Sequence, residues 1–141
     1  MQGRTGRGKG DDDARAAARA RTELGRMGES AAAGWLSARG YAVIGRNVRV
    51  GSDEADIVAI APGGALAVVE VKARRGRWHP EERVDHVKRA RMARLAEALV
   101  ATDAWRDRLV QFDVVAVGIL EDGTREVLHW PCAFDAPRGH G

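Results

Sequence analysis

The chain has 141 residues, 45% of them hydrophobic and 30% charged, which is the composition of a single globular domain able to bury a core. Its one cysteine, Cys132, excludes an internal disulfide and suits a reducing compartment. The net charge of +3 says little about partners, no apolar run approaches the length of a membrane span, and the first ten residues lack the apolar segment of a signal peptide, so we expect a cytoplasmic protein without membrane association.

The first 21 residues predict a basic N-terminal extension that is disordered or frayed. Residues 1–10 combine Gly, Arg and Lys without hydrophobic periodicity. Asp11, Asp12 and Asp13 can cap a following Ala- and Arg-rich helix, since carboxylates favour a helix N-terminus, but that helix is polar enough to fray. We expect the folded domain at residues 22–134 and a second frayed segment at 135–141.

The first core helix is predicted from about Thr22 to Arg39, where Gly40 supplies a common C-terminal cap. Glu29 belongs to an i, i+3, i+4, i+7 series with apolar residues and therefore lies on or beside the buried face of this helix. Helix patterning alone leaves two interpretations open for Glu29, a solvated glutamate or a carboxylate with a partner in the site.

Residues 41–50 predict the first strand, and residues 54–72 predict a β-hairpin. Two runs rich in Val, Ile and Ala flank the sequence Pro-Gly-Gly at residues 62–64. A three-residue loop is favoured because Gly64 can take the left-handed conformation that such loops use. Ala61 then pairs with Ala65.

This register decides where the charged side chains of the hairpin point. It sets Asp56 directly opposite Glu70, whereas a two-residue loop would set it opposite Val71, on the other face. Lys72 shares the face of Glu70 because side chains alternate along a strand. Two facing carboxylates and a lysine are poorly tolerated in an apolar sheet unless a cation neutralises the carboxylates, so the pattern predicts a metal site. Glu54 shares the face of Asp56 and is a candidate for a second acidic ligand, but its place at the strand start slightly favours a solvated charge.

Beyond the hairpin, basic residues are in excess. Residues 76–79 predict a loop in which Trp78 either stacks on an unpaired base or, as is more common, packs over the sheet. His79 is a lone loop histidine, to which we assign no chemistry. The basic residues between positions 72 and 94 are Lys72, Arg74, Arg75, Arg77, Arg83, Lys88, Arg89, Arg91 and Arg94.

The rest of the chain predicts a helix and two strands. A helix over about residues 82–101 connects the hairpin to an apolar strand at 109–120, which a helical crossover would make parallel to the third strand. Asp113 interrupts this apolar run and is expected to have a structural hydrogen-bonding role. An edge strand at residues 126–130 is expected to end at Pro131. The chain is therefore predicted to be an α/β domain with a mixed sheet of about five strands flanked by helices.

An ordered set of residues resembles a known family. Asp56 followed by a hairpin and Glu70-x-Lys72 resembles the signature of the PD-(D/E)xK nucleases, which have the restriction-endonuclease-like fold. The wider set resembles the YraN family of bacterial endonuclease-like proteins from about Thr22 to Phe134. The residues that carry this resemblance are Gly28-Glu29, Ala31-Ala32, Leu36, Gly40-Tyr41, Arg46-Asn47, Glu54, Asp56, Val69-Glu70-Val71-Lys72, Arg74, Lys88 and Phe112-Asp113-Val114-Val115.

The resemblance implies a metal-dependent nuclease that hydrolyses phosphodiester bonds, most naturally in DNA, with Asp56, Glu70 and Lys72 as catalytic residues. Asp56, Glu70, the carbonyl of Val71 and, directly or through water, Glu29 would hold Mg²⁺ or Mn²⁺. Cleavage is expected to be structure-selective, since phosphate contacts carry no sequence information. A homodimer is compatible with this activity. The residues expected to contact the nucleic acid are Arg74, Arg75, Arg77, Lys88 and Arg91.

Two positions depart from the family pattern. Asp53 replaces a glycine that usually precedes the first acidic residue of the hairpin, and Arg89 replaces a glutamine that usually follows the helical lysine. The main alternative is a noncatalytic nucleic-acid-binding module on the same fold. Retention of Asp56, Glu70 and Lys72 favours the nuclease.

Overall fold

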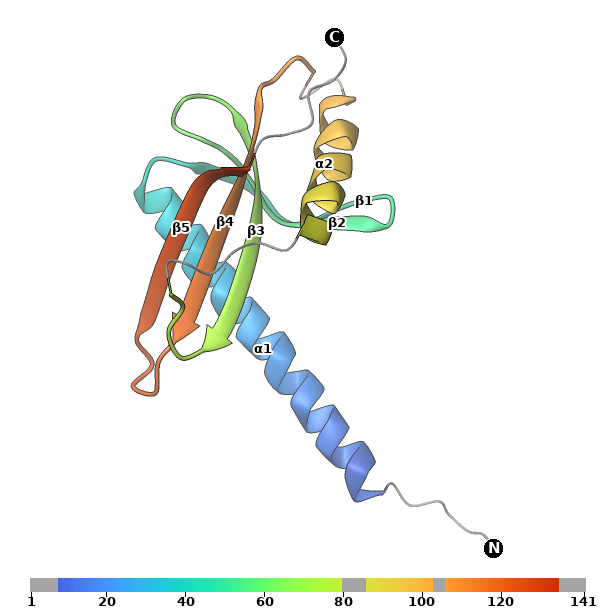
Figure 1. Cartoon of the computed structure of the whole chain (residues 1–141), viewed down its shortest axis with the longest axis vertical. Coiled ribbons are helices and arrows are strands. Elements are labelled where there is room, and N and C mark those ends of the chain that lie inside the picture. Colours follow the sequence, from blue (N-terminus) through green and yellow to red (C-terminus); the bar gives the residue numbers. More distant parts are fainter. Residues whose placement is uncertain (1–7, 80–85, 103–105, 135–141) are drawn as a thin grey trace, which may run out of the picture.

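The computed structural model describes residues 8–79, 86–102 and 106–134, with two helices and five strands in this part of the chain (Figure 1). In chain order they are α1 (Lys9–Ala38), β1 (Ala42–Val50), β2 (Asp53–Ile60), β3 (Leu66–Arg75), α2 (His86–Val100), β4 (Val110–Ile119) and β5 (Arg125–Phe134).

The five strands form one mixed sheet in the order β1-β2-β3-β4-β5. Only β3 and β4 are parallel, and the other neighbours are antiparallel. A parallel pair needs a crossover, and α2 lies between these two strands in the chain. The predicted fold class, a mixed sheet of about five strands flanked by helices, is confirmed.

Each face of the sheet has its own core, and each core includes one helix. Ala32 and Leu36 of α1 pack in a cluster with Val69 and other residues of β2, β3 and β4. On the second face, Met92 and Leu95 of α2 belong to a cluster with strand residues that include Val58, Leu66 and Val68. Neither described helix is long and apolar enough to cross a membrane.

The hairpin has the predicted three-residue loop. The N–H of Ala61 donates to the carbonyl of Ala65 at 2.9 Å, and the N–H of Gly64 donates back to Ala61 at 2.8 Å. Gly64 has a φ of +96°, the left-handed conformation expected for this loop. The ladder then runs from the pair Ile60/Leu66 to the pair Ile57/Val69, so the next positions outward on the two strands are those of Asp56 and Glu70.

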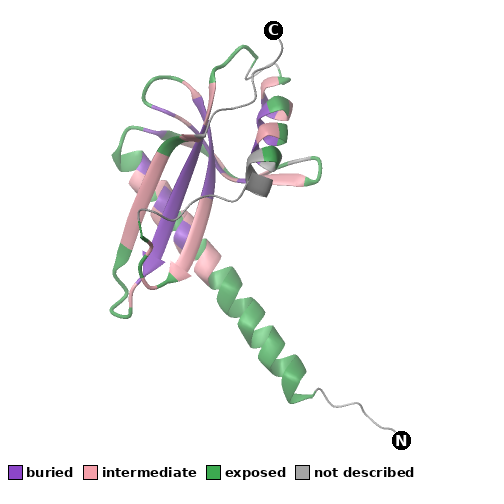
Figure 2. Ribbon diagram, in the orientation of Figure 1, coloured by how far each residue is buried: buried purple, intermediate pink, exposed green. Residues whose placement is uncertain are grey.

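Helix α1 is longer than predicted at its N-terminal end. It begins at Lys9 instead of near Thr22, and residues 8–23 are exposed or nearly so along its projecting half (Figure 2). Alanine and arginine have high helix propensity, so the packed half of the helix can propagate outward without a new nucleation step. The C-terminal end is as predicted, because Gly40 has a φ of +88° and its N–H donates to the carbonyl of Ser37.

Two element boundaries in the second half of the chain were also predicted from the sequence. The prediction that β5 ends at Pro131 is wrong, since this strand continues to Phe134. Proline is tolerated because β5 is an edge strand whose pairing with β4 is irregular between Phe112 and Val114. The predicted start of the second helix near residue 82 lies outside the described residues, within which α2 begins at His86.

The contact between Gly118 of β4 and the backbone after β3 gives a test of the fold. A Cβ atom at position 118 would overlap the carbonyl oxygen of Gly76, whose N–H is bound to Ile119. We expect Gly118→Ala to lower the free energy of unfolding by about 1–3 kcal/mol, the usual cost of overpacking, measured by urea denaturation. Gly63→Ala is the control, because a Cβ atom there meets nothing within 4 Å. Equal stability of the two variants would contradict this packing.

Candidate active site

Strands β2 and β3 separate beyond the pair Ile57/Val69, and we call this point of divergence the fork. The ladder between β2 and β3 ends at this pair, while β1 and β2 stay paired to Val50/Asp53 and β3 and β4 stay paired to Arg75/Ile119. Figure 1 shows β1 and β2 leading away from β3 toward α2. The fork therefore presents one side of residues 70–75 that is not covered by β2.

Asp56 lies on β2 at the start of the fork. Its Oδ2 accepts a hydrogen bond of 2.7 Å from the backbone N–H of Val71. The carboxylate thus takes the place of a main-chain acceptor at the position where the ladder stops. This bond turns the Asp56 side chain toward β3 and toward the segment that carries Glu70 and Lys72.

Glu70 and Lys72 share one face of β3. Ala73 on the same strand lies against Gly28 of α1. Because successive side chains of a strand point to opposite faces, Glu70 and Lys72 face away from α1. Glu70 is only 4% exposed, and Lys72 is partly buried. A carboxylate this buried in an apolar strand is costly unless hydrogen bonds or a cation compensate it. The predicted metal site at Asp56 and Glu70 stays a prediction.

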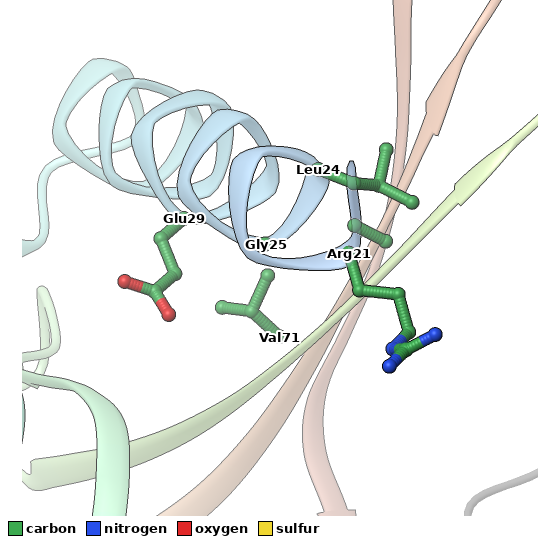
Figure 3. Close-up of a pocket in the computed structure, with 6 residues that line it drawn as sticks. Arg21, Leu24, Gly25, Glu29 and Val71 are labelled. Carbon is green, nitrogen blue, oxygen red and sulfur yellow. The ribbon is translucent and has the colours of Figure 1, made fainter. Parts of the chain in front are cut away.

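Glu29 approaches β3 from the opposite face. It lines a cavity of about 230 Å³ between α1 and β3, together with Val71 and Ala73 (Figure 3). Its Oε1 accepts a hydrogen bond of 3.0 Å from Nδ2 of Asn47, and Arg46 lies 4.0 Å away. These contacts with β1 give Glu29 the partner that a half-buried carboxylate requires.

The donor chemistry fits a hard divalent cation held by two carboxylates. Within residues 8–79, 86–102 and 106–134, no group of three or more His, Cys, Asp or Glu side chains is close enough to hold a metal ion, so Glu29 is not gathered with Asp56 and Glu70. Mg²⁺, however, is commonly held by one or two carboxylates, with water and substrate phosphate completing its shell. Asp56 and Glu70 provide that minimal set, and Val71, whose carbonyl is a further oxygen donor, directly follows Glu70 in the chain.

The basic residues after Glu70 have several different environments. The guanidinium of Arg74 stacks on the ring of Trp78 at 3.6 Å, and the indole N–H of Trp78 donates to the carbonyl of Val117 at 3.0 Å. Trp78 therefore packs over the sheet, the commoner of its two predicted roles. Arg77 forms a 2.6 Å ion pair with Glu126, while Arg75 is exposed. The side chains of Lys88, Arg89 and Arg91 lie outside the described residues.

Two acidic residues near the fork have structural partners. Asp53 accepts two contacts of 3.4 Å from Arg94 and so joins the start of β2 to α2. Glu54 pairs with Arg49 across the β1–β2 ladder at 3.6 Å. Arg49 therefore gives the Glu54 carboxylate a partner of opposite charge at the strand start.

A second polar cluster, centred on Asp113, was only partly anticipated. Asp113 is fully buried, and its Oδ2 binds Tyr41 Oη at 2.6 Å and His129 Nε2 at 2.9 Å. Its Oδ1 accepts from the side chain of Gln111 at 2.8 Å and from the N–H of Cys132 at 3.1 Å. The sequence indicated a structural role for Asp113 but gave no signal for its partners, which are up to 72 residues away in the chain.

The hydrogen bonds of this cluster outweigh the cost of burying its charge. Burial by itself would raise the pKa of Asp113, but the donors from His129, Tyr41, Cys132 and Gln111 hold that pKa below its usual range. Burial, together with the Asp113 carboxylate, raises the pKa of Tyr41 above its usual range. Trp35 donates to Nδ1 of His129 at 3.3 Å, which leaves Nε2 as the protonated nitrogen that faces Asp113.

The Asp113 cluster predicts a pH-dependent contribution to stability. Because folding depresses the pKa of Asp113, its stabilisation is complete above the unfolded pKa of about 3.9 and is lost as the pH falls through the folded value. Asp113→Asn should lower the free energy of unfolding by about 1–3 kcal/mol at neutral pH, because it leaves buried donors unpaired.

Denaturant unfolding between pH 7 and pH 2 measures both effects. The difference in unfolding free energy between the wild type and Asp113→Asn should stay constant above about pH 5 and shrink below pH 4. Glu97→Gln on the exposed side of α2 is the control for loss of a carboxylate. A difference that is the same at every pH would show that the charge of Asp113 does not contribute.

Comparison with known proteins places residues 28–117 in a family model described as "Uncharacterised protein family UPF0102". A UPF0102 protein of Symbiobacterium thermophilum is 46% identical over 71% of this chain and 86% of its own length. Another, from Anaeromyxobacter dehalogenans, is 38% identical over 89% of this chain and 90% of its own. A third, from Syntrophotalea carbinolica, is 43% identical over 82% and 94%, respectively.

Proposed function

The chain belongs to the uncharacterised protein family UPF0102, and from this membership and the geometry of the fork we propose that it is a metal-dependent nuclease of the PD-(D/E)xK type. Its substrate is DNA, and its reaction is the hydrolysis of phosphodiester bonds. The observation that supports the proposal is the register of the three-residue hairpin loop, in which Asp56 and Glu70 are the next residues after the last pair, Ile57/Val69, where β2 and β3 part. Lys72 stands two residues further along the same face of β3.

Asp56 and Glu70 hold a divalent cation, Mg²⁺ or Mn²⁺, with the carbonyl of Val71 as a further oxygen donor. Such an ion, when bound, lowers the pKa of a coordinated water and polarises a phosphoryl oxygen. Lys72 orients the attacking water or stabilises the negative charge that develops on the phosphate. The Asp56 to Val71 hydrogen bond keeps one carboxylate oriented toward β3 before substrate arrives.

The basic residues beyond the fork position the nucleic acid. Arg74, Arg75 and Arg77 follow Lys72 directly, and Lys88 and Arg91 belong to α2. Contacts of these side chains with phosphates fix the register of the strand without reading its bases, so cleavage responds to the shape of the substrate more than to its sequence. Glu29 supports this arrangement from the α1 side through its contacts with Asn47 and Arg46.

A noncatalytic nucleic-acid-binding module is the second candidate. It is favoured by one observation, that no three potential metal ligands are grouped among the described residues. Such a module would keep the fold and the basic residues and would bind nucleic acid without cleaving it.

The test is cleavage of labelled single-stranded, duplex, flap and four-way-junction DNA with Mg²⁺ or Mn²⁺. We expect the wild type to cleave at least one of these substrates, and Lys72→Ala, Asp56→Asn and Glu70→Gln each to lose about 100-fold or more of the rate, because each removes charge stabilisation or a metal ligand. Chelation of the metal should abolish cleavage.

Binding to the same panel in the presence of chelator separates the two candidates. Glu97→Gln, which removes a carboxylate from the exposed side of α2, should cleave like the wild type. Tight binding with no cleavage of any substrate would support the binding module. Cleavage that persists in Asp56→Asn and Glu70→Gln would contradict the proposal that the fork is the active site.

A further inference from the structure

The N-terminal half of α1 is an exposed helix that extends beyond the folded body. We call residues 9–23 the α1 arm. In Figure 2 this half is coloured as exposed and projects past the sheet. The helix packs on the sheet only further along, where the buried residues are Gly28, Ala32 and Leu36. The family model begins at residue 28, so the arm precedes the part of the chain that defines the family.

One side of this helix carries an arginine stripe, formed by Arg15, Arg19 and Arg26. Their spacing of four and then seven residues puts them on one face of a helix. This face lies about 120° around the helix axis from Ala32, the middle one of the buried residues Gly28, Ala32 and Leu36 that face the sheet. Over eleven residues at 1.5 Å each, the stripe extends for about 17 Å along the helix.

The three arginine side chains of the stripe have no charged or hydrogen-bonding partner among the described residues. All three arginines are exposed, and none forms an ion pair or a hydrogen bond through its side chain with any described residue, although Glu23 lies within helical reach of two of them. Three acidic residues, Asp11, Asp12 and Asp13, are confined to the tip of the arm, where they stabilise the helix N-terminus. Between Ala14 and Arg26 the chain has four arginines and one glutamate.

The arm begins beside the C-terminal end of β3, the strand that carries Glu70 and Lys72. Gly28 lies against Ala73, and Arg21 lines the same cavity as Ala73, so the helix passes the C-terminal end of β3 before it leaves the sheet. Figure 1 shows the arm projecting past the end of the sheet at which β3 ends. The basic segment Arg74–Arg77 lies at this same end, immediately after Lys72.

We propose that the arginine stripe of α1 is a docking surface for the phosphate backbone of duplex DNA, which extends the contacts of the fork along the substrate. A straight, rigid row of guanidinium groups is complementary to the regular row of phosphates on a duplex, and it binds without regard to sequence. This inference rests on the proposed function for the identity of the nucleic acid, and it assigns a duplex arm to the substrate.

The test is the salt dependence of duplex binding in chelator, where cleavage cannot occur. Each phosphate contact contributes about 0.9 to the slope of log affinity against log salt concentration. The variant Arg15→Gln, Arg19→Gln, Arg26→Gln should therefore lower the magnitude of this slope by about 2.7. Glutamine has nearly the helix propensity of arginine, so the helix is retained, and circular dichroism checks this.

A matched variant controls for the loss of three positive charges. Arg106→Gln, Arg108→Gln, Arg125→Gln removes the same charge from exposed positions outside α1 and the fork, and it should leave the slope within about 0.9 of the wild type. Equal slopes for the wild type and the stripe variant would overturn the proposal. So would a change from dimer to monomer in the stripe variant with an unchanged slope, measured by sedimentation, since the occupant of the stripe would then be a second copy of the chain.

The outcome is separable from that of the nuclease test. If the wild type cleaves DNA but the stripe variant keeps the wild-type slope, the arm proposal fails and the nuclease stands. If no substrate is cleaved but the stripe variant loses slope, the docking surface stands and the nuclease assignment fails.

Discussion

A hydrogen bond between one side chain and one peptide group marks the point on which the candidate site depends. Where β2 leaves β3, the Asp56 carboxylate accepts from the N–H of Val71 in place of the next main-chain acceptor. Without such an acceptor, the separation of the strands would leave a polar group of β3 unpaired. The same bond turns Asp56 toward Glu70 and Lys72. The same hydrogen bond therefore both satisfies β3 where the sheet opens and orients Asp56 in the candidate site.

The sheet separates two polar clusters of different character. Asp113 lies on the face that packs against α1 and is fully buried, and Tyr41, His129, Gln111 and Cys132 hydrogen-bond to its two oxygens. Such a saturated carboxylate contributes to the specificity and stability of the core. Glu70, nearly as buried, lies on the opposite face beside the fork. Glu70 is next to the place where β2 leaves β3, whereas Asp113 is enclosed by its donors, and Glu70 is the one that the proposed function uses.

Helix α1 joins these regions. Its C-terminal half contributes Trp35 to the Asp113 cluster, and its middle contributes Glu29 to the cavity beside Val71. Its N-terminal half leaves the sheet and carries charges with no partner among the described residues. One continuous helix therefore couples the core, the surroundings of the fork and an exposed basic surface, and a rigid connection of this kind fixes the direction in which the arm points.

The sequence by itself determined the elements whose causes are local. The Pro-Gly-Gly turn and the alternation of the strands were enough to predict the hairpin, its three-residue loop and its register up to the pair Ile57/Val69, because loop length and side-chain period are properties of a few adjacent residues. Gly40 likewise predicted the end of the first helix. The apolar run at 109–120, preceded by a helical pattern, predicted a strand parallel to β3, and the structure has this pairing.

Only the tertiary structure decided features that join distant parts of the chain. The partners of Asp113, the contact of Glu29 with Asn47 and the bond from Trp78 to Val117 each depend on which elements pack together. Pro131 within β5 is explained by that strand's place at the edge of the sheet, and the extended start of α1 by continuity with a packed helix. Local patterns state what a segment can form, whereas burial and the pairing of distant groups decide which of those possibilities has the lowest free energy.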